Sequence, residues 1–496
     1  MLLIYLSSGL LLGWSLGAND AANVFGTAVG TRMVRFRTAA IICSLFVIIG
    51  AVISGAGATH TLGNLGSVNA MAGAFMVALS AAVTVWLMTR WMLPVSTSQA
   101  IVGAIIGWNL FTGSRTDIGS LTKIVTTWIA SPILAAFFAI VLFLIFRQIF
   151  NRTPIHLLRW DAYIRAALII VGAFGSYSLG ANNIANVIGV FVPVAPFSDV
   201  DIGGIIHISG SQKLFLLGGI AISIGVFTYS HRVMQTVGHS LFKLSPITAL
   251  AVVLSHAIVL FLFASEKLAS LLISIGLPPL PLVPVSSSQA IVGAIIGIAI
   301  FKGIRGIKYN VLGGIALGWV TTPIIAGVIT FISLFFLQNV FYLEVSREMV
   351  YKVDQSVIEK LASKGIIQEG FQDIKARRFR NPTRFEMELR NNTDLTQTER
   401  RLVMNYARVD SIYVDEFLLA TKIPPDWFTK DQKASLQKLK GEHFAYPWEF
   451  ADSLRALSPD WHLKPDSREY RVFNRELEMK LEYLQNTFRA DNSHSE

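Results

Sequence analysis

The chain contains a 14-residue segment twice. Residues 94–107 read PVSTSQAIVGAIIG and residues 284–297 read PVSSSQAIVGAIIG, so 13 of the 14 positions are identical. A second similar pair lies upstream, SLGANDAANVFG at 15–26 and SLGANNIANVIG at 178–189. We call these the PVS segments and the GAN segments. Because polar sequences rich in small residues stand in apolar surroundings once in each half, they predict a substrate site at the interface of two repeats in a membrane protein.

The composition divides the chain into a membrane part and a soluble part. Of 496 residues, 53% are hydrophobic and 15% are charged, and the mean hydropathy is +0.53, which is too apolar for a soluble globular protein. Residues 1–343 hold 17 Lys and Arg and 6 Asp and Glu, whereas residues 344–496 hold 25 and 26. We therefore predict a membrane repeat at 1–150, a second repeat at 151–343 and a soluble C-terminal domain at 344–496. The excess basic charge then belongs to membrane loops and indicates no nucleic-acid partner.

Ten apolar segments predict an all-α polytopic protein of the cell membrane. Five segments per repeat is an odd number, so the two repeats would be inserted with opposite orientation, as in many secondary transporters. A spanning helix needs about 20 residues, and several segments are short or interrupted by Gly and Pro, so we expect broken or re-entrant helices among them. The segments are 1–29, 39–57, 70–89, 94–111, 124–146, 166–193, 214–230, 246–264, 284–301 and 311–337.

The cysteine content and the N-terminal segment add two further predictions. The single cysteine, Cys43, lies in an apolar run, so no disulfide framework or zinc motif is predicted. The N-terminal segment MLLIYLSSGLLLGW lacks a basic region and a cleavage site, so we expect it to remain as the first helix.

Asp20 is the strongest single indication of a cation site. Of the six acidic residues in the membrane domain, it alone lies inside an apolar segment. A carboxylate at that depth costs about 3 kcal/mol and needs a partner. It could cap a broken helix, but with the neighbouring amides it offers hard oxygen ligands of the kind that sodium requires. The second GAN segment repeats the pattern with Asn183 in place of Asp20. The predicted sodium site comprises Asn19, Asp20, Asn23, Asn182, Asn183 and Asn186.

The PVS segments predict an anion site. Pro94 and Pro284 would end one helical piece and let another begin, which leaves hydroxyl side chains beside a helix N-terminus. Free backbone N–H groups and the positive end of the helix dipole attract anions there. Tight helix packing is the alternative function of small residues, and we favour it for Gly103, Gly107, Gly293 and Gly297. The predicted anion ligands are Ser96, Thr97, Ser98, Gln99, Ser286, Ser287, Ser288 and Gln289.

Other polar residues of the membrane domain receive less weight. Four histidines are expected in loops or in packing, with proton transfer as the alternative: His207, His231, His239 and His256. Four threonines are expected to bond to their own helix backbone, with a cation site as the alternative: Thr126, Thr127, Thr321 and Thr322. Trp128 and Trp319, in a repeated W-x-x-x-P pattern, are expected to be packing or interface anchors.

The two GAN and two PVS segments, in this order, resemble the signature of the inorganic phosphate transporter family. That family includes sodium–phosphate symporters and proton-coupled carriers, and the resemblance covers roughly residues 1–340. It implies uptake of inorganic phosphate by an inverted-repeat carrier, a homodimer, and no cofactor beyond the coupling ions. It marks the same Asn, Asp, Ser, Thr and Gln side chains as above. The family commonly has Asp where this chain has Asn183, which leaves the coupled cations and a sulfate substrate open.

These observations together predict a secondary active transporter. It would import inorganic phosphate by symport with a cation, sodium first, through alternating access. A proton-coupled phosphate or sulfate permease and an anion channel are the alternatives. An enzyme is not expected, because the sequence shows no nucleophile–base pair, metal cluster or Gly-rich nucleotide loop.

The tail predicts a small, mostly helical domain without assigning its role. An amphipathic pattern places Met349, Val353, Val357 and Leu361 on one helix face. The sequence Gln397-Thr398-Glu399-Arg400 after an Asn-rich turn suggests a capped helix. Regulation, oligomer contact and plain packing all remain open for this domain.

Overall fold

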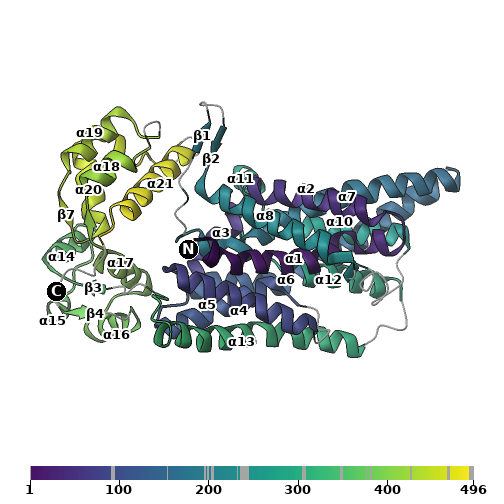
Figure 1. Ribbon diagram of the computed structural model, residues 1–496, viewed down its shortest axis with the longest axis horizontal. Helices are drawn as coiled ribbons and strands as arrows, with labels where there is room; N and C mark the ends of the chain where they lie inside the picture. Colours follow the sequence, from purple (N-terminus) through teal and green to yellow (C-terminus); the bar gives the residue numbers. More distant parts are fainter. Residues whose placement is uncertain are drawn as a thin grey trace. The chain divides into compact units, whose positions relative to one another are not determined.

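The computed structural model describes residues 2–66, 68–90, 95–153, 155–194, 197, 200–202, 206–231, 233–234, 245–303, 309–346, 350–375, 377–379, 382–424, 427–465 and 470–490. The chain divides into two compact units, Met1–Arg347 and Glu348–Glu496. We call them the membrane unit and the C-terminal unit and treat each by itself (Figure 1).

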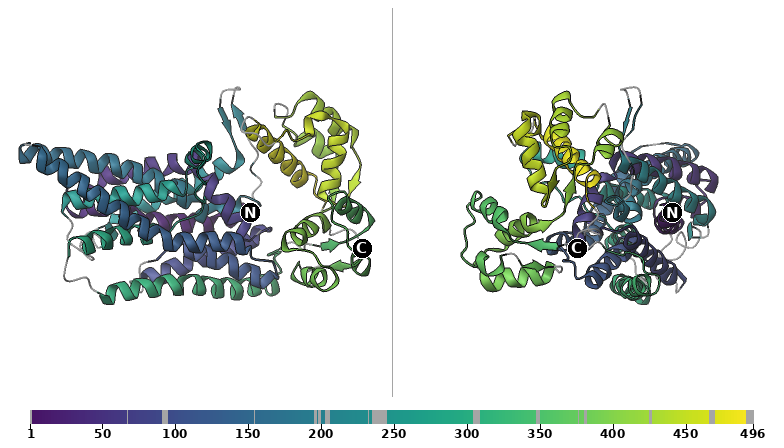
Figure 2. Two further views of the ribbon diagram at one scale, coloured as in Figure 1. Left: turned by 180° about the vertical axis from the view of Figure 1, so that it is seen from behind. Right: turned by 60° about the vertical axis from the view of Figure 1, so that its left-hand side comes forward.

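The membrane unit is a bundle of helices with one short hairpin. Its elements are α1 (Leu2–Gly30), α2 (Phe36–Ser54), α3 (Ala56–Leu65), α4 (Met71–Arg90), α5 (Thr97–Thr112), α6 (Ile118–Arg152), α7 (Leu157–Ile188), η1 (Gly189–Phe191), β1 (Val200–Ile202), β2 (Ile206–Ile208), α8 (Gly210–Thr228), α10 (Pro246–Leu262), α11 (Glu266–Ser274), α12 (Ser287–Phe301) and α13 (Tyr309–Asn339). In Figure 1, α1 lies in the middle of the bundle, with α4, α5 and α13 on one side and α2 and α8 on the other. Both views of Figure 2 place α13 along the edge of the bundle.

The helices confirm the all-α, multi-pass prediction. Within the described part of the chain, seven helices are long and apolar enough to cross a membrane, namely α1, α2, α4, α6, α7, α8 and α13. The other three predicted segments are helices of only 15 to 17 residues, α5, α10 and α12. α10 continues into α11 after a bend of 72°. Two of these short helices, α5 and α12, come from the segments 94–111 and 284–301, which contain Gly and Pro; α10 is the third.

The two halves pack against each other reciprocally, as two related repeats require. A Cβ atom added at Gly17 of α1 would lie 1.9 Å from the carbonyl oxygen of Ile222 in α8. At the equivalent Gly180 of α7 it would lie 2.1 Å from the carbonyl oxygen of Val47 in α2. The first GAN helix thus packs on the second half, and the second GAN helix packs on the first half. Such close backbone approach is possible only because glycine has no side chain.

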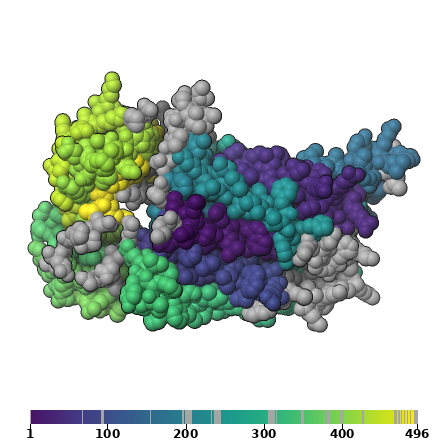
Figure 3. All heavy atoms as spheres, in the orientation of Figure 1, coloured from purple at the N-terminus to yellow at the C-terminus, as the bar shows by residue number. Residues whose placement is uncertain are grey.

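The PVS helices show the same exchange. A Cβ atom at Gly103 of α5 would lie 2.1 Å from the carbonyl oxygen of Pro323 in α13, and one at Gly293 of α12 would lie 2.3 Å from that of Pro132 in α6. These glycines therefore serve helix packing, as expected. Figure 3 shows the resulting mixture on one face, where α1 (dark purple), α4 and α5 (blue-violet) and α13 (green) form adjacent bands.

The lipid-facing surface carries the same internal repeat. Ile133 and Phe137 on α6 are 65% and 58% exposed, and Ile324 and Val328 on α13 are 59% and 52% exposed. Ile324 lies 191 positions after Ile133, and Val328 lies 191 positions after Phe137 (324 − 133 = 191; 328 − 137 = 191). Large apolar side chains that are exposed at one-turn spacing are what a helix facing hydrocarbon requires.

The C-terminal unit is mostly helical with three short strand pairings. Its elements are β3 (Val350–Lys352), α14 (Gln355–Ala362), α15 (Phe371–Ile374), β4 (Arg378–Phe379), α16 (Pro382–Asn392), α17 (Gln397–Ala407), β5 (Arg408–Val409), β6 (Ile412–Tyr413), α18 (Glu416–Thr421), α19 (Lys430–Lys438), β7 (His443–Phe444), α20 (Pro447–Leu457), η2 (Pro459–Trp461) and α21 (Arg471–Thr487). β3 pairs antiparallel with β4 and β5, and β6 with β7. The predicted capped helix is α17, which begins with a capping box between Thr396 and Glu399.

The amphipathic helix predicted through Met349, Val353, Val357 and Leu361 is wrong in its first half. Val357 and Leu361 are buried on α14, but Val353 lies before that helix and Met349 lies outside the described residues. The chain from Val350 to Lys352 is a strand instead. Asp354 accepts a hydrogen bond from the backbone N–H of Val357 and so fixes the helix start after it.

A substitution at a PVS glycine tests the reciprocal packing. We expect Gly293→Ala to lower the melting temperature of the purified full-length protein, because its Cβ meets the Pro132 backbone and overpacking of this kind costs about 1–3 kcal/mol. The matched control is Gly313→Ala on α13, where an added Cβ has no described neighbour within 4 Å. Equal melting temperatures for the two variants would show that the α6–α12 contact tolerates separation.

An acidic cap makes the C-terminal unit sensitive to low pH. Asp354 accepts hydrogen bonds from the Tyr446 hydroxyl at 2.6 Å, Ser356 Oγ at 2.9 Å and the Val357 N–H at 3.2 Å. Burial alone would raise the pKa of Asp354, but these bonds and the charge of Lys352 outweigh it and hold that pKa below its usual range. The stabilisation is therefore complete above the unfolded-state value of about 4 and is lost as the pH falls through the lower folded-state value.

Hydrogen exchange at the amides of α14 in the full-length protein checks this pairing. Tyr446→Phe removes one donor, so we expect local opening to become easier by about 1 kcal/mol, or roughly fivefold in exchange rate. Tyr413→Phe is the control, because Tyr413 stacks on His443 and its hydroxyl forms no hydrogen bond within the described chain. Asp354→Asn should remove the loss of protection at acid pH; an unchanged acid response in that variant would refute the assignment.

Candidate functional site

The two PVS segments meet at the starts of α5 and α12. The Ser98 hydroxyl donates to the carbonyl oxygen of Val285 at 3.0 Å, and the Ser288 hydroxyl donates to that of Val95 at 2.8 Å. These bonds are equivalent in the two repeats, since both Ser98 and Val95 lie 190 positions before their counterparts. Two helix N-termini, one from each half, therefore lie against each other inside the membrane unit.

Both helices begin where the sequence predicted. Ser96 caps α5 by accepting a hydrogen bond from the Gln99 N–H at 3.3 Å, and Ser286 caps α12 by accepting one from the Gln289 N–H at 3.2 Å. The caps satisfy the N–H of the third residue in each helix and leave those of the first two without helix partners. Pro284 precedes the second start, while Pro94 lies outside the described residues. The site thus contains buried donors at the positive ends of two helices.

The GAN segments lie within continuous helices. α1 runs unbroken from Leu2 to Gly30 through Asp20, and α7 runs unbroken from Leu157 to Ile188 through Asn183. Asp20 therefore does not cap a broken helix, which was the alternative considered from the sequence. Residues three apart on a helix share a face, so Asp20 and Asn23 point to the same side of α1.

We call the contacts made by each GAN helix a half-site. In the first half-site, α1 contacts the start of α12. Asn23 Nδ2 donates to the hydroxyl oxygen of Ser287 at 2.9 Å. His256 Nε2 of α10 lies at 2.9 Å from the same oxygen. All three side chains are buried, and His256 and Ser287 are at most 2% exposed. A GAN residue of one half thus contacts a PVS residue of the other.

In the second half-site, α7 reaches the starts of both PVS helices. Asn186 Nδ2 donates to Ser98 Oγ at 2.8 Å and to Asn183 Oδ1 at 2.9 Å. Asn182 donates to the carbonyl oxygen of Val283 at 3.1 Å and accepts from the Val285 N–H at 2.8 Å. Asn182 therefore holds the extended chain before α12 in place with both ends of its amide.

The remaining residues of the predicted cation site differ in their surroundings. Asp20 is 3% exposed, and no described residue forms a hydrogen bond or ion pair with its carboxylate. Asn19 is half-buried, and its Nδ2 lies 3.5 Å from Thr89 Oγ1 at the end of α4. A buried carboxylate without a partner among the described residues is costly at membrane depth, so Asp20 is the position where a bound cation would be stabilised most.

Buried polar atoms without partners gather around the same helices. Within the described chain they include Oε1 of Gln99 and Gln289, Nδ2 of Asn183 and Oδ1 of Asn186. Buried polar groups are normally paired, and the exceptions often mark ligand sites. By contrast, Thr127, Thr321 and Thr322 bond to their own helix backbones, as predicted. For Thr126 the prediction is wrong, because its hydroxyl forms no hydrogen bond within the described chain.

His256 is the site residue that the sequence analysis undervalued. It was grouped with three other histidines as a loop or packing residue, yet it alone of the four lies inside a predicted apolar segment, 246–264. The argument that singled out Asp20 therefore applied to it as well. His231 packs edge-on against Phe36 outside the site, and the rings of His207 and His239 lie outside the described residues.

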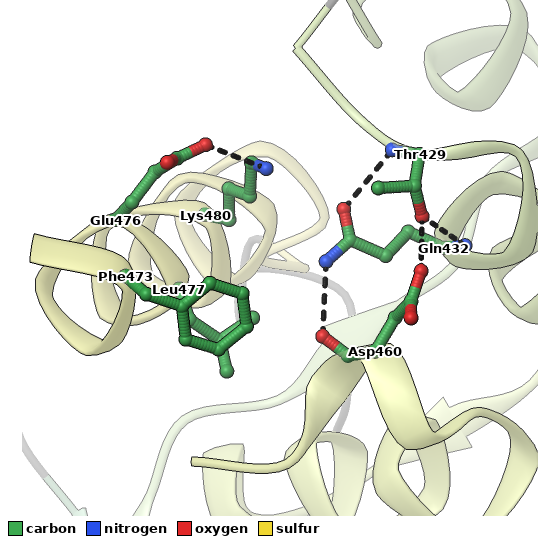
Figure 4. Close-up of a pocket in the computed structure, with 7 residues that line it drawn as sticks. All are labelled: Thr429, Gln432, Asp460, Phe473, Glu476, Leu477 and Lys480. Atoms are coloured by element: carbon green, nitrogen blue, oxygen red, sulfur yellow. Dashed lines mark hydrogen bonds and ion pairs between the residues drawn. The ribbon is translucent and has the colours of Figure 1, made fainter. Parts of the chain in front are cut away.

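A pocket in the C-terminal unit is not part of this site. Figure 4 shows Thr429, Gln432 and Asp460 hydrogen-bonded to one another, and Lys480 paired with Glu476 at 2.8 Å. Because these polar groups satisfy each other, the pocket offers few free donors or acceptors. We assign no function to it.

Comparison with known proteins agrees with the geometry. A model of the phosphate transporter family matches residues 16–275 and 281–407. The chain belongs to this family. The match continues beyond residue 340, where the motif resemblance ended, into the C-terminal unit.

Individual relatives match about two thirds of this chain over nearly their whole length. A phosphate permease of Methanocaldococcus jannaschii is 31% identical over 319 residues, which cover 64% of this chain and 91% of that protein. One of Pyrococcus furiosus is 28% identical and covers 66% of this chain and 94% of its own length. A solved structure named as the sodium-dependent phosphate transporter matches with a TM-score of 0.53 and 22% identity over 68% of this chain and 98% of its own. That likeness shows a shared fold.

Asn182 gives a direct test of how the site is held. Asn182→Ala leaves the N–H of Val285 and the carbonyl oxygen of Val283 unpaired in a fully buried position, which costs about 1–3 kcal/mol for each group. We expect a clear fall in the melting temperature without added ligand. The matched control is the equivalent residue of the first repeat, Asn19→Ala, which loses only a 3.5 Å contact. If both variants melt alike, Asn182 does not position α12.

Proposed function

We propose that the protein imports inorganic phosphate by symport with a cation, sodium first, through alternating access. The observation that carries the proposal is the meeting of the α5 and α12 N-termini between two GAN helices. One half-site contributes a carboxylate and the other only amides. Family membership supports phosphate as the substrate, and we keep a homodimer as the predicted assembly.

The proposed phosphate site uses the side-chain donors at the helix starts that are not donated to a backbone carbonyl of the described chain. The hydroxyls of Ser98 and Ser288 are already donated to backbone carbonyls, so they hold the two helix starts together. The donors that remain are Ser96 and Ser286, whose oxygens accept the cap bonds, Thr97, Ser287, and the amide groups of Gln99 and Gln289. Donors from two directions suit a tetrahedral oxyanion, and the helix ends favour its negative charge.

The proposed cation site is centred on Asp20. Its carboxylate supplies a full negative charge, and Asn19 and Asn23 supply nearby amide oxygens. In the second half-site Asn183 and Asn186 offer neutral oxygens, of which Asn186 Oδ1 has no partner within the described chain. Sodium accepts hard oxygen ligands of this type, in the way calcium and magnesium do. Asn182 is better assigned to positioning, because its amide binds the backbone before α12.

The order of events follows from charge. A cation at Asp20 neutralises the only described carboxylate among the buried residues of the membrane unit. The anion can then bind between the helix starts without repulsion from that carboxylate. Since α5 and α12 belong to different repeats, movement of one repeat against the other would expose the site to the opposite side.

Transport by the purified protein in proteoliposomes tests the proposal. Uptake of labelled phosphate should saturate and should be stimulated by an imposed inward sodium gradient. A proton gradient imposed alone, and sulfate as a competitor, distinguish the proton-coupled and sulfate alternatives. Uptake that is linear in phosphate concentration and insensitive to both gradients would indicate a channel and contradict symport.

Asp20 provides the sharpest variant for coupling. Asp20→Asn keeps the size of the side chain and removes its charge, so we expect sodium stimulation of phosphate uptake to disappear. The control is Asp161→Asn, which breaks only an exposed pair with Arg165 at 3.0 Å on α7. Normal sodium dependence in the Asp20 variant would refute the role assigned to this carboxylate.

A further inference from the structure

We propose that His256 is a positioning residue that turns the hydroxyl proton of Ser287 toward the bound anion. The inference rests on the proposed phosphate site and adds a residue to it from α10. His256 itself would not contact phosphate. It would act through Ser287, the first residue of α12, whose hydroxyl lies beside the helix N-terminus.

The contacts around Ser287 define the arrangement. Ser287 Oγ accepts a hydrogen bond from Asn23 Nδ2 at 2.9 Å, and His256 Nε2 lies at 2.9 Å from the same atom. His256 is fully buried, and its Nδ1 has no partner within the described part of the chain. Nε2 is therefore the only ring nitrogen of His256 with a contact among those residues, and that contact is Ser287.

Counting protons shows what His256 decides. A serine hydroxyl has one proton and two acceptor positions. Asn23 fills one acceptor position of Ser287. When Nε2 carries the imidazole proton, it fills the second position, and the Ser287 proton remains available to an oxyanion. When Nε2 carries none, the Ser287 proton is donated to the ring and is lost to the anion. A negatively charged ligand therefore selects the form of His256 with the proton on Nε2.

The first repeat has no counterpart of this device. Leu79-Ser80-Ala81 in α4 aligns with Leu254-Ser255-His256 in α10, at the 175-position offset that also relates Gly50 to Gly225 (225 − 50 = 175). Ala81 therefore stands where the second repeat has His256. The first-repeat equivalent of Ser287 is Thr97 (287 − 190 = 97), whereas Asn186 donates to the next residue, Ser98, at 2.8 Å. Among the described residues, a histidine therefore contacts the first hydroxyl of a PVS helix in one of the two half-sites only.

Phosphate uptake by variants of the full-length protein in proteoliposomes tests the inference. His256→Gln keeps an N–H donor on a side chain of similar length, so we expect a phosphate KM close to that of the wild type. His256→Leu and His256→Asn cannot donate to Ser287 from the Nε2 position, so they no longer fix the rotation of its hydroxyl, and each should raise KM about fivefold, the effect of one ordinary hydrogen bond. The maximal rate per folded protein should change much less than KM.

Ser287→Ala shows whether the effect passes through the hydroxyl. It should raise KM at least as much as His256→Leu, and the double variant should be no worse than Ser287→Ala alone. His231→Gln, outside the site, is the control for histidine replacement as such. Gel filtration and melting temperature identify any variant that fails to fold, and His256→Asn then replaces His256→Leu in the comparison.

The outcomes separate this inference from the proposed function. A wild-type protein that does not take up phosphate would contradict the proposed function itself. If the wild type is active but His256→Leu and His256→Asn keep its KM, His256 does not position Ser287. Additive effects of the His256 and Ser287 substitutions, or a His256→Gln variant as impaired as His256→Leu, would equally overturn the inference.

Discussion

The structure depends on satisfying polar groups where no water is available. At membrane depth an unpaired backbone or side-chain group costs several kcal/mol, yet a transport site needs free donors and acceptors at that depth. The paired bonds from Ser98 to Val285 and from Ser288 to Val95 resolve this conflict. They hold two helix N-termini together through hydroxyls and leave the other donors of the same segments for a ligand. Asn182 fixes the approach to one of these N-termini.

The two half-sites are related in sequence but differ in chemistry. Asp20 aligns with Asn183 when the two GAN segments are superposed in sequence. His256 aligns with Ala81 when the helices before the PVS segments are superposed in the same way. Both titratable side chains therefore belong to the half-site formed by α1, α10 and α12. The other half-site, at α7 and α5, is built from amides and hydroxyls. An approximate two-fold arrangement can in this way supply positions for two different ions.

Much of this arrangement could be predicted from the sequence, because it is encoded in local patterns. The helix starts after the PVS prolines, the serine caps and the glycine packing follow from residue type and spacing. Partners across the interface could not be predicted: nothing local shows that Asn23 binds Ser287, or that Asn182 binds the backbone rather than an ion. The strand at Val350–Lys352 was missed because its apolar residues also fit a helical period, and pairing with distant strands decided between the two.

The exchange of glycine contacts has a consequence for biosynthesis. α5 packs through Gly103 on Pro323, which follows it by 220 residues in the chain (323 − 103 = 220). While the first half emerges from the ribosome, this 16-residue helix has no α13 to cover its glycine face. The contact between Gly103 and Pro323 can form only after nearly the whole membrane unit has been synthesised. Each repeat therefore completes the packing of the other, and a chain truncated before α13 would lack the surface that covers Gly103.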